Sequence, residues 1–169
     1  MTTKTCKERI NKEYADTMDA LRKLFAAYNG DVCPECDGVG ITDTGICELC
    51  KGEGNLNEES YANEIGTIFD YGLSFDYCGA EDDESASTPG YFRYQISWGG
   101  PSDEFRFYAE KITPYKYAVW KIEYWFLDWY DGAKIVLTGA DYKFMKEFFC
   151  SIFVDNGSAE YEREQWFSQ

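Results

Sequence analysis

The amino-acid sequence predicts an α+β fold: an antiparallel sheet of about four strands, with one helix before the strands and one after them. Helical periodicity of apolar residues is found near the two ends of the chain, and apolar and polar residues alternate in the stretch between. Short turns join the expected strands, which implies antiparallel pairing. Helices outside a run of strands are typical of the α+β class.

The first helix is expected at residues 5–28. Thr5 and Glu8 have the spacing of a capping box, and Asn29 with Gly30 is a typical helix stop. Apolar residues recur at steps of three and four and therefore share one face: Ile10, Tyr14, Met18, Leu21, Phe25 and Tyr28. We expect this face to pack in the core, and a partner-binding or dimerising helix is the alternative.

The chain is expected to have four parts. They are an N-terminal amphipathic helix at 1–30, a cysteine-rich module at 31–56, a sheet domain at 57–154 and a loosely held acidic tail at 155–169. In the sheet domain we expect a short helix at 57–70 capped by Asn57, strands at 71–78, 91–98 and 103–110, one long strand or two at 115–130, a short strand at 133–137 and a helix at 140–153.

Two copies of the motif Cys-x-x-Cys-x-Gly-x-Gly lie close together, at residues 33–40 and 47–54. Two cysteines separated by two residues can bring both sulfur atoms to one metal ion. The glycines allow tight backbone turns that a residue with a Cβ atom would resist. Residues 41–46 can form a hairpin that brings the two copies together.

The motifs predict a zinc hairpin, inserted after the first helix, with four thiolate ligands: Cys33, Cys36, Cys47 and Cys50. A four-thiolate site is coordinatively closed, so the metal stabilises a fold and offers no position to a substrate. A redox-active cysteine pair and an iron–sulfur cluster are the alternatives.

Over residues 33–54 the two copies resemble the zinc region of DnaJ-type chaperones. That region normally has four copies and two zinc ions, whereas this chain has two copies, enough for one ion. The chain has no histidine and therefore no His-Pro-Asp signature of a J-domain, so the resemblance implies the fold of the module rather than a J-protein. Residues 91–108 are similar to uncharacterised proteins carried by bacterial plasmids and phages.

The chain has a formal net charge of −15. Residues 31–84 contain fifteen acidic residues and a single basic one, Lys51. They include a loop expected to be exposed, with Glu81, Asp82, Asp83 and Glu84. The negative charge of this stretch repels nucleic acid, because neutralisation of phosphates by Lys and Arg dominates the affinity of proteins for nucleic acid. The same charge favours a basic protein partner. Solubility alone is the other interpretation.

No catalytic site is expected. The absence of histidine removes the commonest general base and excludes Ser-His-Asp and Cys-His arrangements. Asp103 and Glu104 flank a turn, where we expect them to be solvated. We therefore predict that the protein is not an enzyme.

Aromatic residues make up 18% of the chain, more than one sheet face needs. In a strand, Trp125 and Trp129 point one way and Trp120 points the other, so both faces are aromatic. One face is expected to pack on helices. The other is expected to bind a partner, unless another helix or a second copy in a homodimer covers it.

The function expected from these features is that of a non-enzymatic inhibitor or adaptor that docks on a basic, nucleic-acid-binding protein. Spaced carboxylates can imitate phosphates, as in the antirestriction and anti-CRISPR proteins of mobile elements. The alternative is a chaperone-like or assembly module that uses the zinc hairpin and an aromatic sheet face. The polar first nine residues, the lack of a long apolar run and the scattered cysteines predict a cytoplasmic protein with no secretory leader and no membrane span.

Overall fold

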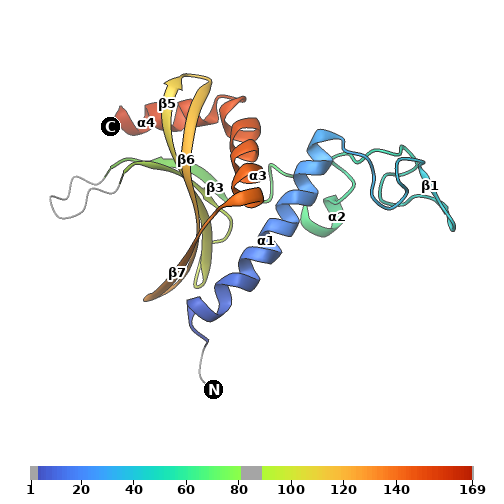
Figure 1. Cartoon of the computed structure of the whole chain (residues 1–169), viewed down its shortest axis with the longest axis horizontal. Coiled ribbons are helices and arrows are strands. Elements are labelled where there is room, and N and C mark those ends of the chain that lie inside the picture. The colour runs from blue at the N-terminus through green and yellow to red at the C-terminus, as the bar shows by residue number, and fades with distance from the viewer. Residues whose placement is uncertain (1–3, 81–88, 169) are drawn as a thin grey trace. The chain divides into compact units, whose positions relative to one another are not determined.

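The computed structural model describes residues 4–80 and 89–168 (Figure 1). The chain divides into two units, one made of Met1–Asn11 with Gly72–Gln169 and the other of Lys12–Tyr71. We call the first the sheet unit and the second the metal unit. Helix α1 (Cys6–Asn29) begins in the sheet unit and ends in the metal unit.

Helix α1 confirms the predicted N-terminal helix. The carboxylate of Glu8 accepts hydrogen bonds from the backbone N–H of Thr5 (2.8 Å) and from its hydroxyl (3.0 Å), which is the glutamate half of a capping box. Gly30, with a φ of 68°, ends the helix. Most of the predicted apolar face is buried, namely Ile10, Met18, Leu21 and Phe25, whereas Tyr28 is exposed.

Five antiparallel strands form the large sheet, in the order β3-β4-β5-β6-β7. The strands are β3 (Ser74–Cys78), β4 (Tyr91–Gln95), β5 (Ser102–Thr113), β6 (Lys116–Asp128) and β7 (Asp131–Val136). The α+β class is confirmed, with one strand more than the four expected, because β7 pairs with β6 along its whole length. The aromatic stretch forms one long strand rather than two.

The helices of the sheet unit pack on one face of the sheet, which we call the inner face. They are α3 (Gly139–Phe149), the π-helix η1 (Cys150–Val154) and α4 (Ser158–Phe167). The ring of Phe149 lies 4.8 Å from that of Phe107 and 5.4 Å from that of Phe92. Phe153 stacks on Phe75 at 3.8 Å. Aromatic rings therefore join the helices to three neighbouring strands, β3, β4 and β5.

Residues 155–169, expected to be a loosely held tail, instead contribute helix α4. Glu160 accepts a hydrogen bond from the hydroxyl of Tyr117 (2.8 Å) and forms an ion pair with Lys111. Ala159 is fully buried. These contacts are with strands more than forty residues earlier in the chain, so the local composition did not reveal them.

The start of α1 is fixed to the β6–β7 hairpin within the sheet unit. The backbone N–H of Cys6 donates to Asp131 (2.6 Å), and Arg9 donates to Asp128 (2.8 Å). The guanidinium of Arg9 also lies 4.8 Å from the ring centroid of Phe126. The hairpin carboxylates thus hold the first two turns of the helix.

The metal unit has less regular structure. Its elements besides α1 are the two-stranded hairpin β1 (Ile41–Thr42) and β2 (Gly45–Ile46) and the single turn α2 (Ala62–Ile65). The helix predicted for residues 57–70 is therefore mostly wrong. Asn57 accepts the backbone N–H of Glu59 (3.0 Å) and so starts a turn, and Gly66, with a φ of 82°, ends α2 after four residues.

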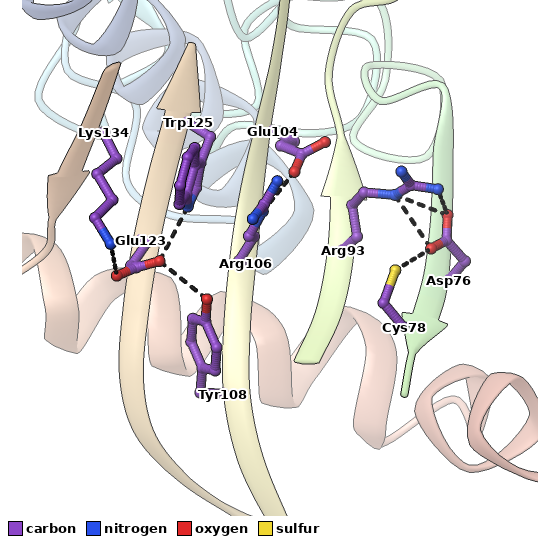
Figure 2. Close-up of polar contacts among 9 residues, drawn as sticks. All are labelled: Asp76, Cys78, Arg93, Glu104, Arg106, Tyr108, Glu123, Trp125 and Lys134. Atoms are coloured by element: carbon purple, nitrogen blue, oxygen red, sulfur yellow. Dashed lines mark hydrogen bonds and ion pairs between the residues drawn. The ribbon is translucent and has the colours of Figure 1, made fainter. Parts of the chain in front are cut away.

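The outer face of the sheet carries a network of charged and aromatic side chains (Figure 2). At its centre Glu123, 2% exposed, accepts hydrogen bonds from Tyr108, Trp125 and Lys134, each at 3.0 Å. Burial alone would raise the pKa of Glu123, but these three donors outweigh it and lower the pKa.

Beside Glu123, the guanidinium of Arg106 lies between two rings, 4.1 Å from that of Trp125 and 4.8 Å from that of Tyr91. It donates to Glu104 at 2.6 Å. One strand further, Arg93 donates three hydrogen bonds to the carboxylate of Asp76, as Figure 2 shows. Ion pairs and aromatic rings therefore alternate across the outer face.

Glu104 and Asp103, predicted to be solvated, are both buried. Asp103 accepts hydrogen bonds from the hydroxyls of Tyr124 (2.7 Å) and Ser97, and Glu104 pairs with Arg106. A buried carboxylate needs such partners, and here they come from β6 (Tyr124), from the loop before β5 (Ser97) and from β5 itself (Arg106).

We predict that Glu123→Gln destabilises the sheet unit by about 1–3 kcal/mol at neutral pH, because Lys134 loses its carboxylate. A depressed carboxyl pKa adds stability above the ordinary pKa, about 4.3, and this stability is lost as the pH falls through the folded-state value. The difference in unfolding free energy between wild type and variant should therefore become smaller at acidic pH. Urea unfolding at neutral and acidic pH measures this difference, and Glu110→Gln, at an exposed position, is the control. An equal difference at both pH values would contradict the prediction.

Candidate functional site

The four cysteines of the two motifs converge in the metal unit. All are buried, and their sulfur atoms lie within 4.8 Å of one another. The Sγ atoms of Cys33 and Cys47 are 3.8 Å apart and those of Cys36 and Cys50 are 3.7 Å apart. A disulfide would need about 2.05 Å. A tetrahedron with ligands at about 2.3 Å from its centre has edges of about 3.8 Å, so the cluster fits one tetrahedral metal ion.

Each motif copy points a backbone N–H at one of its own sulfur atoms. Gly40 donates to Cys36 Sγ at 3.2 Å, and Gly54 donates to Cys50 Sγ at 3.3 Å. The two bonds are equivalent under a shift of fourteen residues, the spacing between the two copies. Such N–H groups favour the thiolate form that a metal ion needs.

The two copies also bind each other through their backbones. Cys33 donates its N–H to the carbonyl of Gly54 (2.8 Å), and Cys47 donates to the carbonyl of Gly40 (3.0 Å). Each copy therefore completes the other, and the duplicated sequence forms a structure with approximate twofold symmetry.

The second glycine of each motif is required by close backbone approach. Gly40 and Gly54 have φ angles of 80° and 81°, which favour glycine. A Cβ atom at Gly40 would collide with the carbonyl of Gly52, and one at Gly54 would collide with that of Gly38. The glycines thus let the two knuckles pack tightly enough to bring the sulfur atoms together.

The thiols differ in how easily they ionise. Burial raises the pKa of Cys33 to about 12, because low-dielectric surroundings penalise the thiolate. Burial acts in the same direction on Cys50, but backbone N–H groups of Gly54 and Gly52 outweigh it and lower the pKa to about 7. Without metal, the thiol of Cys33 therefore keeps its proton at neutral pH. Metal binding must therefore release protons and weaken as the pH falls.

The residues predicted to bind a partner are not gathered in one place. Glu81, Asp82, Asp83 and Glu84 lie outside the described residues. Trp120 is 51% exposed on the outer face, where a register shift in the β5–β6 pairing places its ring 5.4 Å from that of Tyr108. Trp125 also lies on the outer face, in the network around Glu123, so the prediction that Trp120 and Trp125 point to opposite faces is wrong.

Trp129 is 85% exposed in the turn between β6 and β7. Its φ of 52° is a backbone conformation that bulky side chains rarely adopt. Together with Trp98 it lines a shallow cleft formed by the β4–β5 loop and the β6–β7 turn. Of the three predicted tryptophans, Trp129 is thus the most exposed and the most strained.

The sequence predictions missed a group of exposed aliphatic residues on the metal hairpin, Val39, Ile41 and Ile46. The segment has no hydrophobic period that would have drawn attention to them. The available signal was their position beside the motif glycines and cysteines.

No protein-family model, curated protein or solved structure matches this chain. In the part of the chain that the structure describes, none of the helices has the length and apolar character required to cross a bilayer.

We predict that Cys33→Ser or Cys50→Ser abolishes stoichiometric metal binding and unfolds residues 31–55, because the module has no other core. The sheet unit should stay folded on its own aromatic core. Metal analysis and amide NMR spectra of the purified variants measure both effects. Cys150→Ser, outside the cluster, is the control. Retention of one metal ion per chain in either ligand variant would contradict the four-cysteine assignment.

We also predict that Trp129→Gly stabilises the sheet unit by about 1 kcal/mol, since it relieves a left-handed backbone and gives up little buried surface. Thermal or urea unfolding measures the change. Tyr130→Gly is the control, because Tyr130 is also a fully exposed aromatic residue of the same turn but does not have a positive φ. A loss of stability for Trp129→Gly would show that the side chain supports the fold.

Proposed function

We propose that this chain is a non-enzymatic, zinc-binding adaptor or inhibitor whose acidic metal unit docks on a basic, nucleic-acid-binding protein. One observation carries the proposal: every carboxylate of residues 31–70 is exposed around a buried four-cysteine centre. The ten residues are Asp31, Glu35, Asp37, Asp43, Glu48, Glu53, Glu58, Glu59, Glu64 and Asp70.

Zinc is the ion that best suits four thiolates at tetrahedral spacing. A closed site of this kind makes the metal a structural element that holds the surrounding loops in fixed positions. The complex of one zinc ion with four thiolates has a charge of about −2, which adds to the field of the carboxylates.

Residues 31–70 of the metal unit have little positive charge to neutralise this electrostatic field. Their single basic residue is Lys51, which forms an ion pair with Glu59. Both side chains of that pair are more than half exposed, so solvent screens it. The remaining carboxylates attract a basic surface and repel nucleic acid.

Carboxylates on a rigid scaffold can occupy a site that normally receives phosphates. The proposed partner is therefore a protein with a phosphate-binding surface, such as a nuclease or another DNA-binding effector in the cytoplasm. The resemblance of residues 91–108 to plasmid and phage proteins favours an anti-defence inhibitor of the antirestriction or anti-CRISPR kind.

A non-catalytic role is supported by the chemistry of the titratable groups. The chain has no histidine, and four of its seven cysteines form the metal cluster. The carboxylates of the outer sheet face, Glu104, Glu123 and Asp76, are each engaged by basic side chains.

The test is capture of partners from a bacterial lysate by the immobilised, zinc-loaded protein, followed by a salt gradient. We expect basic DNA- or RNA-binding proteins to be captured and released by salt. The affinity of the purified partner should fall by roughly tenfold or more from low to high ionic strength, since exposed charges are screened.

Two variants with four neutralised carboxylates each provide the matched comparison. Asp37→Asn, Asp43→Asn, Glu48→Gln and Glu53→Gln in the metal unit should abolish capture. Glu110→Gln, Glu147→Gln, Asp155→Asn and Glu164→Gln in the sheet unit should not, although the net charge changes equally. Equal loss in both variants, or binding that is insensitive to salt, would rule out docking through the metal unit.

A further inference from the structure

We propose that the tip of the metal hairpin is an apolar anchor site for a basic, amphipathic segment of the partner protein. The site consists of Val39, Ile41 and Ile46, which we call the aliphatic tip. The inference rests on the proposed function, because it takes the partner to be basic. It adds where the partner is held and which side chains the partner must present.

The three side chains of the aliphatic tip are unusually exposed for their type, at 69% for Val39, 58% for Ile41 and 71% for Ile46. Ile41 and Ile46 are direct cross-strand partners in the β1–β2 hairpin. Directly opposite residues of an antiparallel pair place their side chains on the same face, with Cβ atoms about 5 Å apart. The two isoleucines therefore form one apolar surface.

The tip is held in place by the metal motifs. Val39 donates its backbone N–H to the carbonyl of Cys36 at 2.9 Å, so its position follows from the first knuckle. A Cβ atom on Gly52 would lie 3.2 Å from Cγ2 of Ile46, which shows that this side chain rests on the second knuckle. A surface ordered before binding loses little conformational entropy when a partner docks.

The aliphatic tip is not needed to fill a core, because the cysteine cluster forms the centre of the module. Val32 is the residue of the first motif copy that corresponds to Ile46 in the second. A Cβ atom on Gly38 would lie 3.2 Å from Cγ1 of Val32, the same distance as between Gly52 and Ile46. Exposed aliphatic groups cost solubility, and a module that keeps three of them exposed within residues 39–46 is typical of a binding site.

The same module carries many carboxylates close to the aliphatic tip in sequence. Exposed acidic residues flank it in sequence on both sides: Glu35, Asp37, Asp43, Glu48 and Glu53. An apolar centre with a charged rim is the usual anatomy of a protein interface, in which the centre contributes most of the affinity and the rim sets specificity.

This arrangement selects one kind of occupant by charge complementarity. A segment with apolar side chains flanked by Lys or Arg would cover the tip and pair with the rim. An acidic apolar segment would be repelled by the rim, and a basic segment without apolar residues would leave the tip in water. A second copy of this chain has the same charge of −15 and is therefore disfavoured.

The experiment uses the zinc-loaded, full-length protein and three labelled peptides of equal length in fluorescence anisotropy. The first peptide is an amphipathic Lys/Leu helix, the second has Ser in place of every Leu, and the third has Glu in place of every Lys. The test variant is Ile41→Ser with Ile46→Ser. The matched control is Ile112→Ser with Val136→Ser, two exposed aliphatic residues of the sheet unit.

We expect the Lys/Leu peptide to bind at least tenfold more tightly than the Lys/Ser peptide, and the Glu/Leu peptide not to bind. The Ile41→Ser, Ile46→Ser variant should lose this preference while it keeps its metal and its NMR spectrum. The control variant should bind as the wild type does. In NMR titrations, the largest shifts with the Lys/Leu peptide should fall on the amides of Val39, Ile41 and Ile46.

The outcomes separate this inference from the proposed function. Equal binding of the two lysine peptides, unchanged by Ile41→Ser with Ile46→Ser, overturns the anchor site and leaves electrostatic docking intact. Failure of both lysine peptides to bind at low salt contradicts the basic partner itself and the anchor site with it. Equal weakening in the test and control variants also overturns the anchor site.

Discussion

The metal unit is organised around four buried thiols that are placed to bind one metal ion. Four buried thiols side by side do not attract one another, and the raised pKa of Cys33 shows that burial opposes ionisation there. A metal ion reverses this, because it binds the deprotonated form of all four sulfur atoms. The glycine contacts between the knuckles and the fixed positions of the carboxylates and aliphatic residues follow from that coordination. We therefore expect the proposed binding surface to be lost when the metal ion is removed.

The sheet unit is stabilised differently. Its inner face is a continuous aromatic core that joins the strands to α3 and η1, as Phe149 and Phe153 show. Its outer face is polar but ordered, since Glu123 and Arg106 are held by several partners each. Nothing in this core requires metal. We therefore expect the metal unit to need a bound ion in order to fold, whereas the sheet unit folds on apolar burial.

The features predicted correctly from the sequence are those with local causes. The spacing of the cysteines and glycines was sufficient to find the cluster, and apolar periodicity was sufficient for α1 and the strands. The misses depend on distant partners. Asp103 is buried because Tyr124, twenty-one residues away, donates to it, and α4 is fixed by the bond from Tyr117 to Glu160 across forty-three residues. The register shift that sets the face of Trp120 likewise depends on pairing with β5.

The exchange of backbone hydrogen bonds between the two motif copies has a consequence for assembly. Each copy by itself offers two sulfur atoms, one N–H group and one carbonyl that only another copy can satisfy. Because a short connection, residues 41–46, joins the copies, each sees the other at an effective concentration of roughly millimolar or more. Association of the two copies of one chain is therefore favoured over association of copies from different chains. The shortness of the connection between the two copies therefore favours a metal centre formed within one chain.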